Sequence, residues 1–389
     1  MQLLNSSPMP IKRCREKKVV RFPMATFIPY PETVQFRDAI TYVNRHMQHN
    51  LSHDSDRSRT LKFLGTVKLH GTHAAIVYQQ KLGRWCESRN RILSITNDNA
   101  GFAQHMDRLA EQFLSDYVLF DSSTIRKYYE EGSTIVIHGE WCGADVQDKS
   151  NVAICSLPKM FVIFKIKIIC ERKKSTKSAS SAEEKYKESP NGFWLEPKEW
   201  SQIKWHEKSI YNIYEFPTYE IDIDFHAPDR SQDQLTKLTE AIDRQCPVGA
   251  HFGQNGCGEG IVWVEWQQTH GALTFKVKGP QHRIINSDVL VPIQTPKMNS
   301  MEEFVDYACT KNRMQQAYHC LEEEYGSVSA KDCAVFIRWL VEDIIKEERE
   351  TMDESHIDRR DLTRAITSKA EKWFNEHLME NRKRKGGRK

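Results

Sequence analysis

The spacing of apolar residues changes along this chain near Pro292 and Pro296. Before the prolines, apolar and β-branched residues form short runs separated by polar turns, a pattern typical of strands. The runs occupy residues 62–78, 134–139, 160–170, 260–266 and 272–278, and helical patterns occupy 102–115 and 231–244. After the prolines the spacing predicts long amphipathic helices at 301–325, 330–350 and 361–379. We therefore expect an α+β domain of antiparallel sheets and helices, followed by an all-α C-terminal domain.

Composition divides the chain further. We expect a basic flexible N-terminus at 1–25, the α+β domain at 26–295, the helical domain at 296–380 and a basic tail at 381–389. Residues 171–190 contain one aromatic and no large aliphatic side chain, so they cannot pack into a core, and we predict a mobile loop. The longest apolar stretch, 160–170, is interrupted by two lysines and is too short to span a membrane.

Charge is distributed unevenly around a net value of +3. Residues 1–25 hold six basic side chains and one acidic one, and residues 381–389 hold six basic and none acidic. The segment 301–380 holds eleven basic and nineteen acidic side chains. Any nucleic acid would therefore bind the folded body through a local patch and not through bulk charge. The basic ends are interpreted as solubilising termini or, alternatively, as a nucleic-acid arm and a nuclear address at 382–385.

The ten cysteines include no Cys-x-x-Cys pair and no metal-ligand spacing, and the chain starts without an apolar signal segment. These features predict a reduced intracellular compartment, cytoplasm or nucleus. Because the first 25 residues are basic and poor in acids, a mitochondrial presequence is the alternative.

A series of short motifs indicates the chemistry. The sequence KLHG at 68–71 places a lysine at a strand end before a glycine turn, where an amine and the backbone can both approach a phosphate. Alone, such a tetrapeptide is more typical of a surface turn. Five further motifs follow in order: SRNR at 88–91, IHGE at 137–140, FVIF at 161–164, EGIV at 259–262 and FKVK at 275–278.

This ordered set resembles the covalent nucleotidyltransferase superfamily of polynucleotide ligases and mRNA capping enzymes. His70 stands where DNA ligases and capping enzymes usually have Asp, and so resembles the RNA ligase 2 group, which includes the RNA-editing ligases. The segment 309–345 looks like the helical C-terminal domain of that group, whereas DNA ligases and capping enzymes carry a β-barrel there. The resemblance covers roughly residues 62–350.

The resemblance implies an ATP-dependent RNA ligase that joins a 3′-OH end to a 5′-phosphate end, with ATP and Mg²⁺ (or Mn²⁺) as cofactors. Lys68 would attack the α-phosphorus of ATP and hold AMP. Lys276 and Lys278 alternate on one strand and therefore share a face, so we expect both to point at the α-phosphate and to lower the pKa of Lys68. The alternative interpretation is a polar outer face of an amphipathic strand.

The other motif residues receive roles from the same resemblance. Glu140 and Glu259 would bind the ribose hydroxyls and a divalent cation, because two carboxylates facing a polyphosphate need a cation between them. Phe164 would stack on adenine, although its alternation with neighbouring apolar residues also fits a core strand. His70 and Gly71 are expected at the nucleotide, where His70 would orient the nucleophile loop or contact a phosphate. Arg89 would contact ATP and the phosphates of the RNA donor end, and the alternative is a surface arginine of a hairpin. The other expected RNA contacts are Lys311, Arg313 and Lys331.

Two positions depart from the family pattern. His73 stands where the family often has Asn, and Val67 where it often has Glu before the nucleophile. Both changes fall in the nucleotide pocket and affect the expected metal and base contacts.

The alternatives to an RNA ligase are a DNA ligase or capping-type guanylyltransferase, and a catalytically inactive RNA-binding relative. Protein partners and oligomeric state are not indicated.

Overall fold

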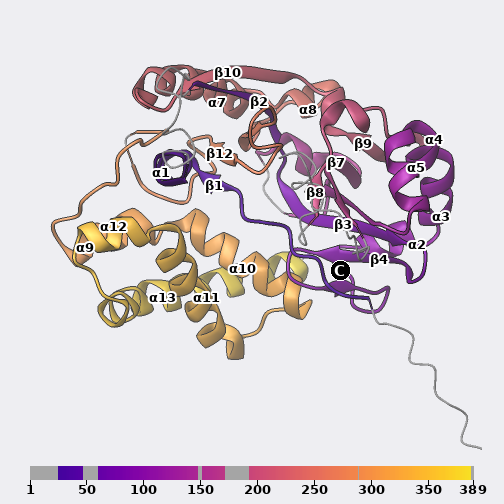
Figure 1. Cartoon of the computed structure of the whole chain (residues 1–389). Coiled ribbons are helices and arrows are strands. Elements are labelled where there is room, and N and C mark those ends of the chain that lie inside the picture. Colours follow the sequence, from indigo (N-terminus) through magenta and orange to yellow (C-terminus); the bar gives the residue numbers. More distant parts are fainter. Residues whose placement is uncertain (1–24, 47–59, 148–150, 171–191, 288, 387–389) are drawn as a thin grey trace, which may run out of the picture.

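The computed structural model describes residues 25–46, 60–147, 151–170, 192–287 and 289–386. Within these ranges two β-sheets pack with helices into a mixed α+β body, and the chain ends in a group of helices (Figure 1). The expected fold class is confirmed. The predicted loop at 171–190, and all but the last residue of the expected N-terminus, lie outside the described residues. Among the residues that are described, no helix has the length and apolar character needed to cross a membrane.

The first sheet carries Lys68 of the first motif and the last two motifs. Its strand order is β1 (Val34–Gln35), β12 (Thr274–Lys278), β11 (Gly260–Glu265), β2 (Thr60–Lys68) and β10 (Thr218–Asp224). All neighbours are antiparallel except β1 and β12, which run parallel. Apolar residues of this sheet share one core with α1 (Phe36–His46), α7 (Gln232–Arg244) and α8 (Pro247–His251). The predicted helix at 231–244 is thus confirmed as α7.

The second sheet carries the central motifs. Its order is β5 (Ile92–Leu93), β4 (Gly83–Ser88), β3 (Gly71–Gln79), β6 (Thr134–Cys142), β7 (Met160–Ile169) and β8 (Phe193–Trp194), and β9 (Ile210–Asn212) pairs with β7. One face packs on α2 (Phe102–Asp107), α3 (Ala110–Phe113), a π-helical turn at Leu114–Val118, α4 (Leu119–Asp121) and α5 (Ser123–Glu130). The single helix predicted at 102–115 is therefore divided into two.

The strands predicted within 62–78 do form, but they do not pair with each other. The chain leaves the first sheet after Lys68 and enters the second sheet at Gly71. The KLHG motif thus lies where the two sheets meet. Gly71 is required there, because a Cβ would lie 2.4 Å from the carbonyl oxygen of Trp141.

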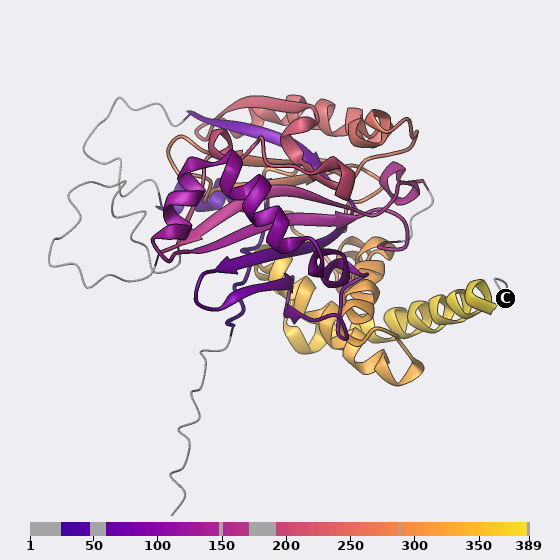
Figure 2. The same ribbon diagram turned by 90° about the vertical axis from the view of Figure 1, so that its right-hand side faces the viewer.

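The helical region contains α9 (Met301–Ala308), α10 (Lys311–Tyr325), α11 (Cys333–Glu347), α12 (Arg349–Glu354) and α13 (Arg359–Gly386). These helices share a hydrophobic core that includes Phe304, Phe336 and Phe374. The helix predicted at 301–325 is interrupted after Ala308, and Thr310 caps α10 by accepting a hydrogen bond from the backbone N–H of Arg313. Figure 2 shows the last part of α13 extending away from the body, so residues 381–386 of the expected tail continue this helix.

The segment before β1, residues 25–33, crosses the second sheet and is called the N-terminal strap here (Figure 1). Ile28 and Ala25 pack against buried Ala75 and Val77 of β3. The backbone N–H of Ile28 donates to the carboxylate of Glu87 at 3.1 Å. The strap therefore connects the face of the second sheet to the edge of the first.

Candidate active site

A cavity of about 500 Å³ lies between the two sheets and helices α10 and α11. All nine residues that the motifs predict for nucleotide binding line it: Lys68, His70, Gly71, Arg89, Glu140, Phe164, Glu259, Lys276 and Lys278. They come from strands of both sheets, from the turn between the sheets and from loops at strand ends. The structure thus brings together residues more than 200 positions apart, while their individual roles stay predictions.

Glu259 lies at the centre of the charged part of the cavity. One of its carboxylate oxygens is 2.9 Å from Lys68 Nζ and 3.1 Å from Lys278 Nζ, and the other is 3.5 Å from His70 Nδ1. The strand register explains this arrangement, because Gly260 pairs with Lys68 on one side and with Lys278 on the other. Gly260 has a φ of +148°, and a Cβ there would lie 2.1 Å from a carbonyl oxygen of β12, so only glycine fits.

These contacts set the protonation of the two lysines. Burial lowers the pKa of Lys68, but Glu259 and Glu140 outweigh burial, so the pKa is raised above its ordinary value. The expectation that neighbouring lysines would depress this pKa is therefore wrong. The depressed pKa belongs to Lys278, where burial prevails over the attraction of Glu259. Lys68 is consequently held as an ammonium.

Glu140 provides the second carboxylate of the cavity. It lies on β6 opposite His73, and burial together with nearby Glu259 raises its pKa to about 8, although Lys68 acts in the opposite direction. The charge of Glu259 thus disfavours ionisation of Glu140, and a divalent cation between the two carboxylates would offset this repulsion. The described part of the chain holds no cluster of three or more His, Cys, Asp or Glu side chains placed to bind a metal. A cation would thus need further oxygen ligands from a nucleotide or water.

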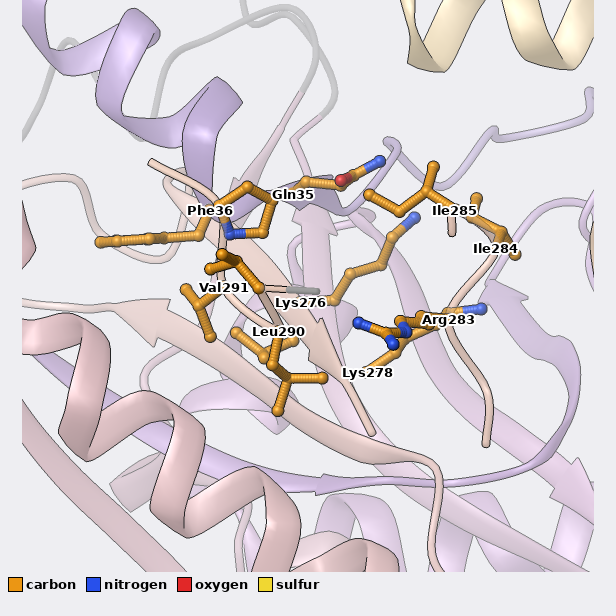
Figure 3. Close-up of a pocket in the computed structure, with 12 residues that line it drawn as sticks. Gln35, Phe36, Lys276, Lys278, Arg283, Ile284, Ile285, Leu290 and Val291 are labelled. Carbon is orange, nitrogen blue, oxygen red and sulfur yellow. The ribbon is translucent and has the colours of Figure 1, made fainter. Parts of the chain in front are cut away.

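Lys276 has a different partner from Lys278. Its Nζ is 3.6 Å from a carboxylate oxygen of Glu347, at the end of α11. Gln35, which pairs with Lys276 in the strand register, donates a hydrogen bond to the same carboxylate at 3.0 Å. Lys276 and Lys278 also line a second pocket of about 50 Å³ beside Arg283 (Figure 3). The helical region thus contacts a predicted phosphate-binding lysine.

Phe164 lies at a bulge in β7. His138 of β6 pairs with Lys165, but the next residue, Gly139, pairs with Ile163, so Phe164 has no partner in the register. Phe164 packs on the same core as Val162, and beyond the bulge the alternation of faces is shifted by one residue. A Cβ on Gly139 would lie 2.3 Å from the Phe161 ring, so glycine is also required here.

The two departures from the family pattern have structural explanations. His73 Nε2 lies 3.1 Å from His138 Nδ1, and burial followed by the charge of Arg89 lowers the pKa of His73 to about 3. A neutral histidine pair thus replaces the family's asparagine. Val67 is buried in the core of the first sheet.

The three residues of the helical region that we expected to contact RNA differ in solvent exposure. Arg313 is fully buried and pairs with Glu348 at 3.1 Å and with Asp343 at 3.2 Å, so its predicted RNA contact is wrong. Lys311 and Lys331 are exposed, and their RNA contact stays a prediction.

Sequence reasoning also missed one polar face of α10. Asn312, Gln315, Gln316, His319 and Glu323 line the cavity. Their three- and four-residue spacing places them on one face of a helix, but neutral polar side chains in this pattern are also typical of a solvent-exposed face.

A comparison with protein families decides the assignment of the chain. The model of the family described as RNA ligase matches residues 61–278, more than half of the sequence. The chain belongs to the RNA ligase family. The part of this RNA ligase family member that matches contains all nine predicted nucleotide-binding residues and ends at Lys278, before the helical region.

Solved structures similar to this RNA ligase family member include mutants of Naegleria gruberi RNA ligase. One, described as apo, is 15% identical with a TM-score of 0.39, and the match covers 66% of this chain and 58% of that one. Another, with AMP and Mn, is 15% identical with a TM-score of 0.38 and the same coverage. The chain thus spans somewhat more than half the length of these ligases. No curated protein matches its sequence.

Proposed function

We propose that the chain is an ATP-dependent RNA ligase of the RNA ligase 2 and RNA-editing ligase group. It would join a 3′-OH end to a 5′-phosphate end through a lysyl-AMP intermediate. The observation that carries this proposal is the cluster of Lys68, Glu259 and Lys278 in a cavity that also contains Phe164. An amine, a carboxylate and a second cation at one wall, with an aromatic ring in the same cavity, suit attack on the α-phosphorus of a bound nucleotide.

The first step follows from the contacts of Lys68. Its ammonium group must release a proton to solvent water before the amine attacks, and Glu259, 2.9 Å from Nζ, orients the amine. A nitrogen–phosphorus bond then forms to the α-phosphorus, and the bond to pyrophosphate breaks. Lys276 and Lys278 are placed to offset the charge that develops on the phosphate oxygens.

Two further steps would complete joining. The 5′-phosphate of an RNA displaces Lys68 and takes the AMP, and the 3′-hydroxyl of the other end then attacks this 5′-phosphate, releasing AMP. Arg89 lines the cavity and is proposed to contact the donor end, and exposed Lys311 and Lys331 the RNA backbone. Glu140 and Glu259 would hold Mg²⁺ or Mn²⁺, which supplies charge neutralisation on the phosphates when bound.

The division of labour is part of the proposal. Residues 26–295 would act as the nucleotidyltransferase domain and 296–380 as a helical domain that aligns the RNA ends. The helices have a core distinct from those of the two sheets, and Ile284 and Ile285 from the segment before residue 295 pack into it. Because α10 and α11 line the cavity, they are also placed to contact a bound substrate.

The proposal is tested by supplying the purified protein with Mg²⁺, α-labelled ATP or GTP, and nicked or single-stranded RNA or DNA with 5′-phosphate and 3′-OH ends. We expect label on the protein from ATP only and sealed RNA. Label from GTP would favour a capping-type enzyme, and preferential sealing of DNA would favour a DNA ligase. Absence of any label would indicate an inactive RNA-binding relative.

A further inference from the structure

Tyr30 of the N-terminal strap enters the cavity beside Phe164. The two ring centroids are 5.5 Å apart, and the ring planes meet at 76°. Both side chains line the cavity. A planar base stacked face to face on Phe164 would make the same steep angle with the Tyr30 ring. Phe164 would then contact the face of the base, and Tyr30 would contact its edge.

The surroundings hold the Tyr30 ring in one place. His73 and His138 lie 5.1 and 4.9 Å from its centroid, Trp194 lies at 5.7 Å, and the Arg89 guanidinium carbon lies 5.9 Å from it. The Tyr30 hydroxyl also hydrogen-bonds to the side chain of Thr33. The ring is therefore ordered before any ligand arrives, which reduces the entropy cost of binding.

The sequence around Tyr30 limits its backbone as well. Pro29 precedes Tyr30 and Pro31 follows it. A proline fixes its own φ and also restricts the residue before it to extended conformations. The extended course of residues 25–33 is thus favoured locally, and this course carries the ring across the second sheet.

We propose that Tyr30 is a nucleobase-contacting residue, supplied by the N-terminal strap as the second aromatic wall of the site. The inference rests on the proposed function, which places a base at Phe164. Ile28 provides the contrast within the same strap, because it packs against the sheet and does not line the cavity. If the Tyr30 ring served only to attach the strap, we would expect it to pack against the sheet, as Ile28 does, and not to line the cavity.

The test measures equilibrium binding in a full-length Lys68→Ala background, where AMP transfer is blocked. Isothermal titration calorimetry measures the dissociation constants of ATP and of tripolyphosphate. The proteins compared are the one with Tyr30 intact and its variants Tyr30→Phe, Tyr30→Ala, Tyr30→Leu and Ile28→Ala. Thermal melting checks that each variant is folded. We expect Tyr30→Ala and Tyr30→Leu to weaken ATP binding roughly tenfold. Tyr30→Phe and Ile28→Ala should stay within about twofold, and tripolyphosphate binding should be unchanged throughout.

The inference is overturned if a folded variant without the ring binds ATP normally, if tripolyphosphate binding weakens to the same extent, or if Ile28→Ala loses as much affinity as Tyr30→Ala. The Leu variant keeps an apolar side chain in case the Ala variant unfolds. If the protein with Lys68 intact never accepts AMP, while loss of the ring still weakens ATP binding, the proposed function fails and the assignment of Tyr30 stands.

Discussion

At the scale of residues, one carboxylate shared by two lysines determines the charge balance of the site. Glu259 contacts Lys68 and Lys278, and their charges hold its pKa well below the ordinary value despite burial, which acts in the opposite direction. Removing either lysine would change the protonation of the other.

Lys278→Ala is expected to lower the rate of AMP transfer to the protein roughly 10²-fold, because a cation at the reacting phosphate is lost. The rate of label incorporation at saturating ATP measures this effect. Lys62→Ala is the control, since Lys62 lies on the same strand as Lys68 but forms an exposed pair with Glu220. Equal rates for the two variants would support the alternative that Lys278 belongs to a polar strand face.

The sequence predicted which residues meet at the site but not the contacts between them. Motif order identifies Lys68, Glu259 and Lys278. That Glu259 contacts both lysines follows from a strand register that no local sequence pattern encodes. For this reason the direction of the Lys68 pKa was predicted wrongly. Arg313 was misassigned because a buried ion pair and an RNA-binding cation look alike in sequence.

At the scale of elements, irregularities position the functional side chains. The chain changes sheets between Lys68 and Gly71, and the bulge in β7 shifts the alternation of faces after Phe164. The periodicity of apolar residues predicts the strands themselves, because it depends on burial of one face. It does not predict a bulge or the pairing partner, which depend on distant segments. The N-terminal strap was missed for the same reason.

The stability of the folded protein should depend on pH through Glu87, the carboxyl that the strap contacts. This carboxyl accepts hydrogen bonds from the backbone N–H of Ile28 and from Trp85, yet burial raises its pKa from 4.5 to about 7. The folded state thus binds a proton more tightly than the unfolded state. The contribution to stability is complete below pH 4.5 and is lost as pH rises toward 7, by up to about 3 kcal/mol.

Glu87→Gln removes this titration and keeps an acceptor for Ile28. Urea unfolding at several pH values should show that the variant gains stability relative to the original protein between pH 4.5 and 7. A constant difference between the two proteins across this range would show that Glu87 does not titrate there.

At the scale of the whole molecule, the helical region is joined to the α+β body by buried charges. Arg37 of α1 donates to Glu348 at 2.6 Å, to the hydroxyl of Tyr307 at 2.9 Å and to the backbone carbonyl of Glu347 at 3.0 Å. Breaking a buried ion pair from one side leaves an uncompensated charge. This network therefore fixes how the helices cover the cavity.

Arg37→Ala should lower the free energy of unfolding by about 3 kcal/mol, because buried Glu348 loses one of the two cations that pair with it and keeps Arg313. Arg45→Ala, on the same helix but exposed in a pair with Glu350, should change it by less than about 0.5 kcal/mol. Denaturant unfolding of both variants gives the comparison. Similar small losses would mean that the buried network does not stabilise the assembly of the two regions.

The contact between Glu347 and Lys276 predicts a gain of function. Glu347→Gln keeps the hydrogen bond to Gln35 but frees the lysine for a phosphate, so the KM for ATP in AMP transfer should fall roughly two- to fivefold. Glu342→Gln is the matched control, because Glu342 is exposed on the same helix. An unchanged or higher KM in Glu347→Gln would show that this contact does not compete with the nucleotide.

The assignment of Lys68 as the nucleophile is the central claim, and peptide mass spectrometry tests it most directly. The purified protein is incubated with ATP and Mg²⁺, digested under neutral or basic conditions that preserve a phosphoramide, and searched for peptides that carry one AMP. We predict a single modified site at Lys68, and no AMP on any peptide of Lys68→Ala. AMP attached to another residue, or modification that persists in Lys68→Ala, would contradict the account.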